Sequence, residues 1–214
     1  MTTDALADSI AARYPTRFLR TYVRSKVRVD PVYDAVFERL RGSDEPLLDV
    51  GCGIGILALY LRARGFHAAI RGIDNDDRKI AIAKSVTRDA TFEVADARME
   101  IDAGGTIVLL DLLHYFRGEE QSRILASAAA SATTVIIRDA IRDGSWRYRF
   151  TYLQEMFSRV IRWLRADRLH FPTRDDVMRP FGSFQAEVVP LYGRTPFNNY
   201  LFVFKRSTDG ITNP

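Results

Sequence analysis

The chain has 214 residues, of which 47% are hydrophobic and 27% are charged, and its formal net charge is +4. These values fit one substantial globular domain, and every apolar run is far shorter than the roughly 20 residues of a membrane-spanning helix. The single cysteine, Cys52, excludes an internal disulfide and a cysteine-rich metal site, so no metal is expected. Because the first residues do not follow a secretion-signal pattern, we expect a cytoplasmic protein without an integral membrane segment.

Residues 1–42 are predicted to form an N-terminal helical cap, because apolar residues recur three and four positions apart. One helix through this region would carry a face of arginines, namely Arg13, Arg17, Arg20, Arg24 and Arg28. Such a face is either a solvated surface with local ion pairs or a docking surface for an acidic carrier protein or an anionic surface. Nucleic acid is not expected there, since no aromatic residues interleave the arginines for stacking.

Strands and helices then alternate within residues 43–206. This alternation predicts an α/β fold with a doubly wound parallel sheet that is covered by helices on both faces. The expected strands are Leu47–Val50, Ala69–Asp74, Thr91–Val94, Thr106–Leu110 and Thr133–Arg138, and the expected helices are Ile54–Arg64, Asp77–Arg88 and Glu119–Ala130. Two further strands are expected in "SFQAEVVPLYG" and "FNNYLFVFKR".

A helical insertion is predicted at about 140–170, within an arginine-rich stretch from Arg138 to Arg168. Its apolar residues recur at helical spacing and are expected to be core, although a ligand platform is the alternative. These residues are Trp146, Phe150, Leu153, Phe157, Ile161 and Leu164. The polar segment 207–214 is expected to be a flexible tail.

The run "LLDVGCGIGILALYL", residues 47–61, indicates a strand, a tight glycine turn and a helix. Gly51, Gly53 and Gly55 would let a ligand approach the backbone closely, and the following helix would offer free N–H groups to it. Asp74 ends the second strand 19 positions after Gly55, where a carboxylate can accept hydrogen bonds from ribose hydroxyls. The alternatives are a plain turn for the glycines and a helix N-cap for Asp74.

The glycine turn alone fits either a nicotinamide cofactor or another adenosine ligand. Asp49 precedes the glycines, and Asp96 in "FEVADA" follows the third strand, where it could accept a hydrogen bond from an adenine amino group or bond its own turn. The chain also has no second cofactor-binding half, which a dinucleotide would need.

The ordered runs "LLDVGCGIG", "GIDNDDRKIAIAK", "FEVADA" and "TIVLLDLLHYF", spanning residues 46–140, resemble the motif series of class I S-adenosylmethionine-dependent methyltransferases. The resemblance implies a Rossmann-like seven-stranded sheet with an antiparallel last strand. It also implies S-adenosylmethionine as cofactor and S-adenosylhomocysteine as product. The cofactor-binding residues that it implies are Asp49, Gly51, Gly53, Gly55, Asp74, Asn75, Asp96, Ala97, Asp111 and Leu112.

His114 follows the fourth strand and is the best-placed candidate for a general base, with packing against the sheet as the alternative. The motifs of nucleic-acid amine, protein-arginine and arsenic methyltransferases are absent from the sequence, which favours a small acceptor, flat or apolar, that is methylated on O, C or N. The acceptor-side candidates are Tyr22, Arg28, Tyr115, Tyr148 and Tyr152.

The segment "FLRTYVRSKVRVDPVYDAVFERL" resembles methyltransferases of bacterial aryl polyene pigment clusters. That resemblance implies an aromatic acceptor held on an acyl carrier protein, with ring methylation next to a phenol hydroxyl whose phenolate His114 would help to form. Lys26 or Arg28 could instead clamp the cofactor's carboxylate. The alternative functions are an RNA or nucleoside methyltransferase, a nicotinamide-dependent oxidoreductase, and a non-catalytic cofactor-binding protein.

Overall fold

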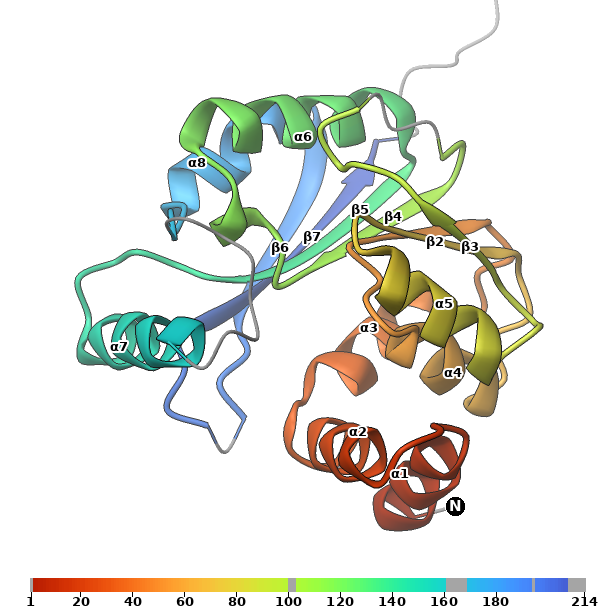
Figure 1. Ribbon diagram of the computed structural model, residues 1–214. Coiled ribbons are helices and arrows are strands. Elements are labelled where there is room, and N and C mark those ends of the chain that lie inside the picture. Colours follow the sequence, from red (N-terminus) through yellow and green to blue (C-terminus); the bar gives the residue numbers. More distant parts are fainter. Residues whose placement is uncertain (1, 100–102, 161–168, 194, 208–214) are drawn as a thin grey trace, which may run out of the picture. The chain divides into compact units, whose positions relative to one another are not determined.

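The computed structural model describes residues 2–99, 103–160, 169–193 and 195–207, apart from the side chains of 155–160 (Figure 1). The chain divides into two compact units, which are described one at a time. Unit 1 holds Met1–Met99 and Gly193–Thr195, and unit 2 holds Glu100–Tyr192 and Pro196–Pro214.

The strands form a seven-stranded sheet in the order β3-β2-β1-β4-β5-β7-β6. Strand β7 runs antiparallel to β5 and to β6, whereas β1, β2 and β3 are parallel to one another, as are β4 and β5. The predicted Rossmann-like fold with an antiparallel last strand is therefore confirmed. The strands are β1 (Leu47–Val50), β2 (Ile70–Asp74), β3 (Thr91–Val94), β4 (Thr106–Leu110), β5 (Thr134–Ala140), β6 (Phe184–Pro190) and β7 (Asn199–Arg206).

Unit 1 contains β1 to β3 and five helices. All four residues of β1 are buried, as expected for a strand that lies inside a parallel sheet. Helices α1 and α2 lie side by side in Figure 1 and pack through the apolar faces that their sequence spacing predicts. The helices are α1 (Thr3–Ala12), α2 (Arg17–Val29), α3 (Val32–Leu40), α4 (Ile56–Ala63) and α5 (Asp77–Val86).

The prediction of one continuous arginine-bearing helix is wrong, because the chain breaks between α1 and α2. Pro15 disfavours helical backbone at the residue before it, and the side chain of Thr16 caps α2 by accepting a hydrogen bond from the Leu19 N–H. Arg13 therefore occupies the C-cap of α1, while Arg17 begins the next helix. The two arginines belong to different helices.

Unit 2 contains β4 to β7, with helices α6 and α8 side by side in Figure 1. Its core includes β5, which is buried from Val135 to Ala140, and an aromatic stack in which Phe181 lies against Phe204 with ring centroids 3.9 Å apart. The remaining elements are η1 (Leu113–Tyr115), α6 (Gly118–Ser131), α7 (Trp146–Val160), α8 (Arg174–Met178) and η2 (Arg179–Phe181).

The apolar stripe of α7 is not core where the structure describes it, so that prediction is wrong for three of its residues. Trp146 is 63% exposed, Phe150 44% and Leu153 70%. Helix α7 is instead attached through Thr151, which is buried and whose Oγ1 accepts the Asn198 N–H at 2.9 Å. The side chain of Phe157, residues Ile161 and Leu164, and the predicted tail from 208 onward lie outside the described residues. Within the described part of the chain, no helix is both long and apolar enough to cross a membrane.

In unit 2 the side chain of Phe204 is buried and that of Leu153 is exposed, so their replacement by alanine should reduce stability by different amounts. Phe204→Ala should lower the free energy of unfolding by about 3–5 kcal/mol, because it removes a buried ring from the stack with Phe181. Leu153→Ala should cost less than about 0.5 kcal/mol, because that side chain is exposed. Urea unfolding of both variants tests this, and similar losses would show that the α7 stripe is packed after all.

Candidate active site

In unit 1 the turn between β1 and α4 requires glycine at three alternate positions. Gly51, Gly53 and Gly55 have φ values of 79°, 55° and 80°, a region that other residues rarely adopt. The N–H groups of Gly51 and Cys52 both donate to the carbonyl oxygen of Ile73, at 2.8 and 2.9 Å, which fixes the turn to β2. The conformation therefore explains all three glycines.

The same turn leaves backbone groups accessible. A Cβ atom added at Gly53 would meet no atom within 4 Å, so this side of the loop is open. Helix α4 begins directly after Gly55, and no described side chain caps its first turn. Free N–H groups and the positive end of the helix dipole thus lie beside an open glycine loop, as in nucleotide-binding sites.

Asp74, at the end of β2, joins the second strand to the glycine loop. Its Oδ2 accepts the Gly53 N–H at 3.0 Å, and its Oδ1 accepts the Asp76 N–H at 2.9 Å. The N-cap of α5 is Asp76, whose carboxylate accepts the Arg78 N–H. Asp74 is therefore not the N-cap of this helix, which was the alternative to ligand binding. The Asp74 carboxylate therefore lies beside the glycine loop.

Asp49 on β1 and Cys52 within the glycine loop both have buried side chains. Burial, with a smaller contribution from the Asp74 carboxylate, raises the pKa of Asp49 from 3.8 to about 7. Burial also raises the pKa of the Cys52 thiol, which fits a packing role and not a nucleophile. Sequence reasoning missed Gly72, where an added Cβ would lie 2.9 Å from both Cβ and Sγ of Cys52. Only glycine on β2 leaves room for the Cys52 side chain.

The remaining predicted cofactor residues of unit 1 differ in their surroundings. The Asp96 carboxylate accepts hydrogen bonds from the backbone N–H of Arg98 at 2.9 Å and from its Nε at 3.0 Å, and this pairing lowers the pKa of Asp96. Ala97 is buried, whereas Asn75 is exposed just beyond β2. Asp96 therefore bonds its own turn, which was the alternative to adenine binding, and each of its oxygens still has lone pairs for a ligand.

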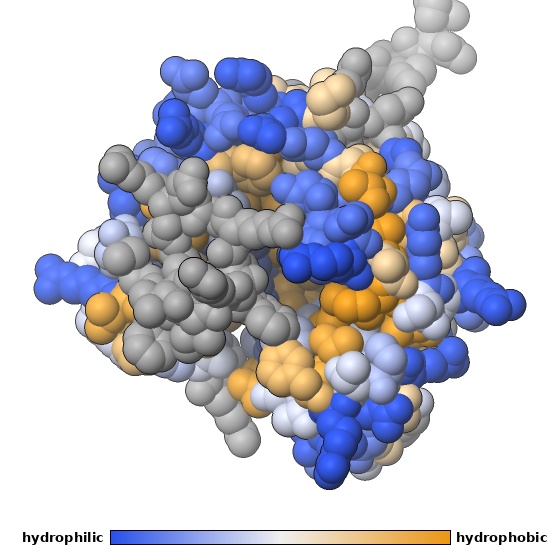
Figure 2. Space-filling model, in the orientation of Figure 1, coloured by the Kyte–Doolittle hydropathy of each residue, from blue (hydrophilic) through white to orange (hydrophobic). Residues whose placement is uncertain are grey.

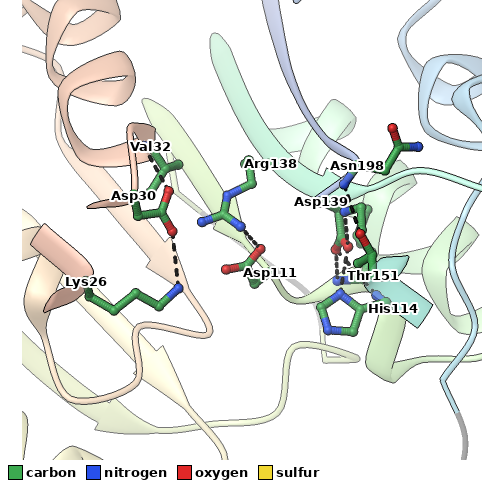
Figure 3. Close-up of polar contacts among 11 residues, drawn as sticks. Lys26, Asp30, Val32, Asp111, His114, Arg138, Asp139, Thr151 and Asn198 are labelled. Atoms are coloured by element: carbon green, nitrogen blue, oxygen red, sulfur yellow. Dashed lines mark hydrogen bonds and ion pairs between the residues drawn. The ribbon is translucent and has the colours of Figure 1, made fainter. Parts of the chain in front are cut away.

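In unit 2, the end of β4 carries Asp111 and Leu112. Asp111 has φ 54°, the one positive value among the described non-glycine residues, and its carboxylate forms an ion pair with the guanidinium of Arg138 (Figure 3). Arg138 is buried on β5, so this first residue of the arginine-rich stretch from Arg138 to Arg168 does not contribute to a basic surface. A residue held in a left-handed backbone conformation by an ion pair with a buried arginine is typical of a functional loop.

His114 lies in η1 and is buried against β5. Its Nδ1 is 2.6 Å from Oδ1 of Asp139, a residue with no exposed surface that sequence reasoning missed (Figure 3). The Oδ2 atom of the same carboxylate accepts the Leu113 N–H at 2.8 Å. A His–Asp pair of this kind fits a general base and the carboxylate that orients it.

Aromatic rings surround the His114 imidazole within unit 2. The ring of Phe171 stacks on it with centroids 5.3 Å apart, and Tyr115 lies 4.1 Å away at a tilt of 52°. Tyr148 and Tyr152 contact the other edges of Phe171, with centroid distances of 5.7 and 6.1 Å. Three predicted acceptor-side tyrosines thus lie near His114. Tyr115 contacts the imidazole directly, and Phe171, which sequence reasoning missed, links Tyr148 and Tyr152 to it.

The N-terminal candidates have local partners in unit 1. Arg28 Nε lies 2.9 Å from Asp4, Arg24 Nε lies 2.6 Å from Asp8, and Lys26 Nζ lies 3.2 Å from Asp30 (Figure 3). Arg20 donates to the Tyr14 carbonyl, and Tyr22 is half-buried on α2. Figure 2 shows a strongly hydrophilic surface where α1 and α2 lie. Local ion pairs, the simpler of the two interpretations, thus account for Arg24 and Arg28.

Comparisons with known proteins agree with this geometry. A family model described as a methyltransferase domain matches residues 20–190. The fold is similar to that of magnesium protoporphyrin IX methyltransferase (ChlM) from Synechocystis PCC 6803 with bound SAH, at 19% identity and a TM-score of 0.66, over 95% of this chain and 93% of that one. It is also similar to the pyocyanin biosynthetic protein PhzM, at 16% identity and a TM-score of 0.64, over 93% of this chain and 61% of that one. Small RNA methyltransferase HEN1 matches at 14% identity and a TM-score of 0.64, over 82% of this chain and 25% of that one. At these identities the likenesses show a shared fold.

The raised pKa of Asp49 predicts a pH-dependent cost to stability. Between about pH 4 and about pH 7 the folded state keeps a proton on Asp49 that the unfolded chain has released, so this residue destabilises the fold increasingly as pH rises. Asp49→Asn should therefore gain stability relative to the natural protein over that range, by a total of about a few kcal/mol. Urea unfolding at several pH values measures the difference, and the exposed Asp44→Asn is the control. A difference that does not change with pH would contradict the assignment.

Proposed function

The chain belongs to the methyltransferase-domain family as a class I enzyme that uses S-adenosylmethionine, and on that premise we propose that it methylates a small aromatic acceptor bearing a hydroxyl group. The observation that carries the proposal is the His114–Asp139 pair among the rings of Tyr115 and Phe171. The family match also decides against the nicotinamide-dependent oxidoreductase that the glycine turn alone left open.

Unit 1 supplies residues that fit the cofactor. The open loop at Gly53 and the uncapped start of α4 offer N–H donors, and the buried Asp74 offers carboxylate lone pairs for ribose hydroxyls. Burial raises the pKa of Asp49, and a cationic group of a bound cofactor near it would favour the charged carboxylate and lower that pKa. When bound, S-adenosylmethionine supplies a methyl group on a positively charged sulfur.

Unit 2 supplies the groups that would act on the acceptor. The half-buried rings of Tyr115 and Tyr148 favour a planar acceptor, through offset or edge-to-face ring contacts, while the buried Phe171 packs against Tyr148 and His114. His114 would take the proton of the acceptor hydroxyl, because a phenolate is a far better nucleophile than a phenol at neutral pH. The buried setting excludes water from this proton transfer.

Delivery of the acceptor on an acyl carrier protein stays a prediction. Of the five arginines from Arg13 to Arg28, three are exposed without an ion pair in the described part of the chain, and one of these, Arg20, donates to the Tyr14 carbonyl, which leaves Arg13 and Arg17. These two residues would be the first to test for electrostatic docking of an acidic partner.

Asp74 and Asp76 form a matched pair for testing the cofactor site. Asp74→Asn should weaken binding of S-adenosylhomocysteine about 10-fold or more, because one of its two acceptor oxygens is lost from a charged hydrogen-bonding group. Asp76→Asn should leave affinity unchanged, because asparagine also caps α5. Calorimetric titration with S-adenosylmethionine, S-adenosylhomocysteine and NADH measures both variants. Equal changes of affinity in the two variants would show that Asp74 does not bind the cofactor.

His114 is tested by transfer of a radioactive methyl group from S-adenosylmethionine to a panel of phenols and catechols. His114→Gln should lower kcat by about 10²–10⁴-fold, since it removes the base while its amide still fills the space. The affinity for S-adenosylhomocysteine should not change, because His114 is not among the residues proposed to bind it. A variant with natural kcat would show that acceptor deprotonation does not depend on His114.

A further inference from the structure

The Asp139 carboxylate is enclosed by hydrogen-bond donors. Its Oδ1 accepts the Ala140 N–H at 2.8 Å and lies 2.6 Å from Nδ1 of His114. Its Oδ2 accepts the Leu113 N–H at 2.8 Å and the His114 N–H at 3.4 Å. Since a backbone N–H can only donate, both oxygens of Asp139 act as acceptors.

This arrangement determines which ring nitrogen of His114 carries a proton. A carboxylate can only accept hydrogen bonds, so the contact at 2.6 Å between Asp139 and His114 has Nδ1 as its donor. We infer that Asp139 is a positioning residue that holds His114 in the Nδ1–H tautomer and leaves Nε2 as the proton acceptor. Only the role of Nε2 as the base that takes the proton of the acceptor hydroxyl rests on the proposed function.

The plane of the imidazole is fixed as well as its tautomer. Phe171 stacks on one face at an interplanar angle of 18°, and the His114 carbonyl accepts the His170 N–H at 2.8 Å. The Nε2 amide of Gln121 donates to the carbonyls of Leu113 and Phe116, both at 3.0 Å, and also to that of His170. The backbone on both sides of the His114 ring is therefore tied to α6. A half-turn of the ring within its plane would keep the stack with Phe171 but would break the contact between Nδ1 and Asp139.

A purely structural role for Asp139 makes a different prediction. In that case the carboxylate only satisfies the turn N–H groups of Leu113 and His114, and the protonation of the ring does not depend on it. The two roles differ in one observable, which is the state of the His114 ring nitrogens.

The test is nitrogen-15 NMR of imidazole-labelled protein saturated with S-adenosylhomocysteine near neutral pH. The chain has three histidines, so His67→Gln and His170→Gln assign the signals of His114 without changing it. We expect a protonated Nδ1 and an unprotonated Nε2 in the natural protein. A ring protonated on both nitrogens, or on Nε2 alone, would overturn the inference, and this measurement requires no substitution at Asp139.

Asp139→Asn is the second measurement. An amide NH₂ in place of Oδ1 would donate to Nδ1 and should move the proton to Nε2, whereas Asp175→Asn on the exposed start of α8 should leave the signals unchanged. An unchanged tautomer in folded Asp139→Asn would overturn the inference. On a phenolic acceptor the same variant should lose about 10²–10⁴-fold in kcat, with KM and the affinity for S-adenosylhomocysteine nearly unchanged. If the tautomer is as expected but no phenol is methylated, the proposed acceptor is wrong while the role of Asp139 stands.

Discussion

The burial of the Asp139 carboxylate is the constraint on which unit 2 depends. A carboxylate removed from water costs several kcal/mol unless donors replace the water. Strand β5 places Asp139 in the interior, so the chain after β4 must turn to bring the Leu113 and His114 N–H groups to it. The short η1 helix meets that requirement, and it also places the His114 ring against the same carboxylate. One buried carboxylate thus fixes both the backbone of η1 and the position of the His114 side chain.

Unit 1 follows the same principle with a different residue. Asp74 ends β2 and accepts N–H groups from the glycine loop and from the turn before α5, so a carboxylate again joins two loops at the end of a strand. The loop can approach Asp74 because Gly53 adopts a left-handed conformation, and the sheet can receive Cys52 because Gly72 has no side chain. Two different glycines therefore permit the polar contacts of the loop and the close packing beneath it.

The arginines show that a basic sequence need not give a uniformly basic surface. Arg138 is buried and paired with Asp111, while Arg24 and Arg28 are paired with acidic residues of α1. The acidic partners lie 16 to 27 positions away in the sequence, and folding brings them close. A charge pattern read along one helix does not contain these pairings, since they depend on how helices and strands pack.

The sequence by itself determined the order of strands and helices, the glycine loop and the position of Asp74. These features depend on hydrophobic period and on local backbone conformation, which neighbouring residues specify. Only the tertiary structure decided that Arg13 lies off the arginine-bearing helix, that Trp146 and Leu153 are exposed, and that Asp139 and Phe171 join His114. Asp139 is 25 positions from His114, so their contact exists only once β5 pairs with β4. Helical spacing identifies the apolar face of a helix, but it does not show whether that face is buried. Burial depends on the elements that pack against the face.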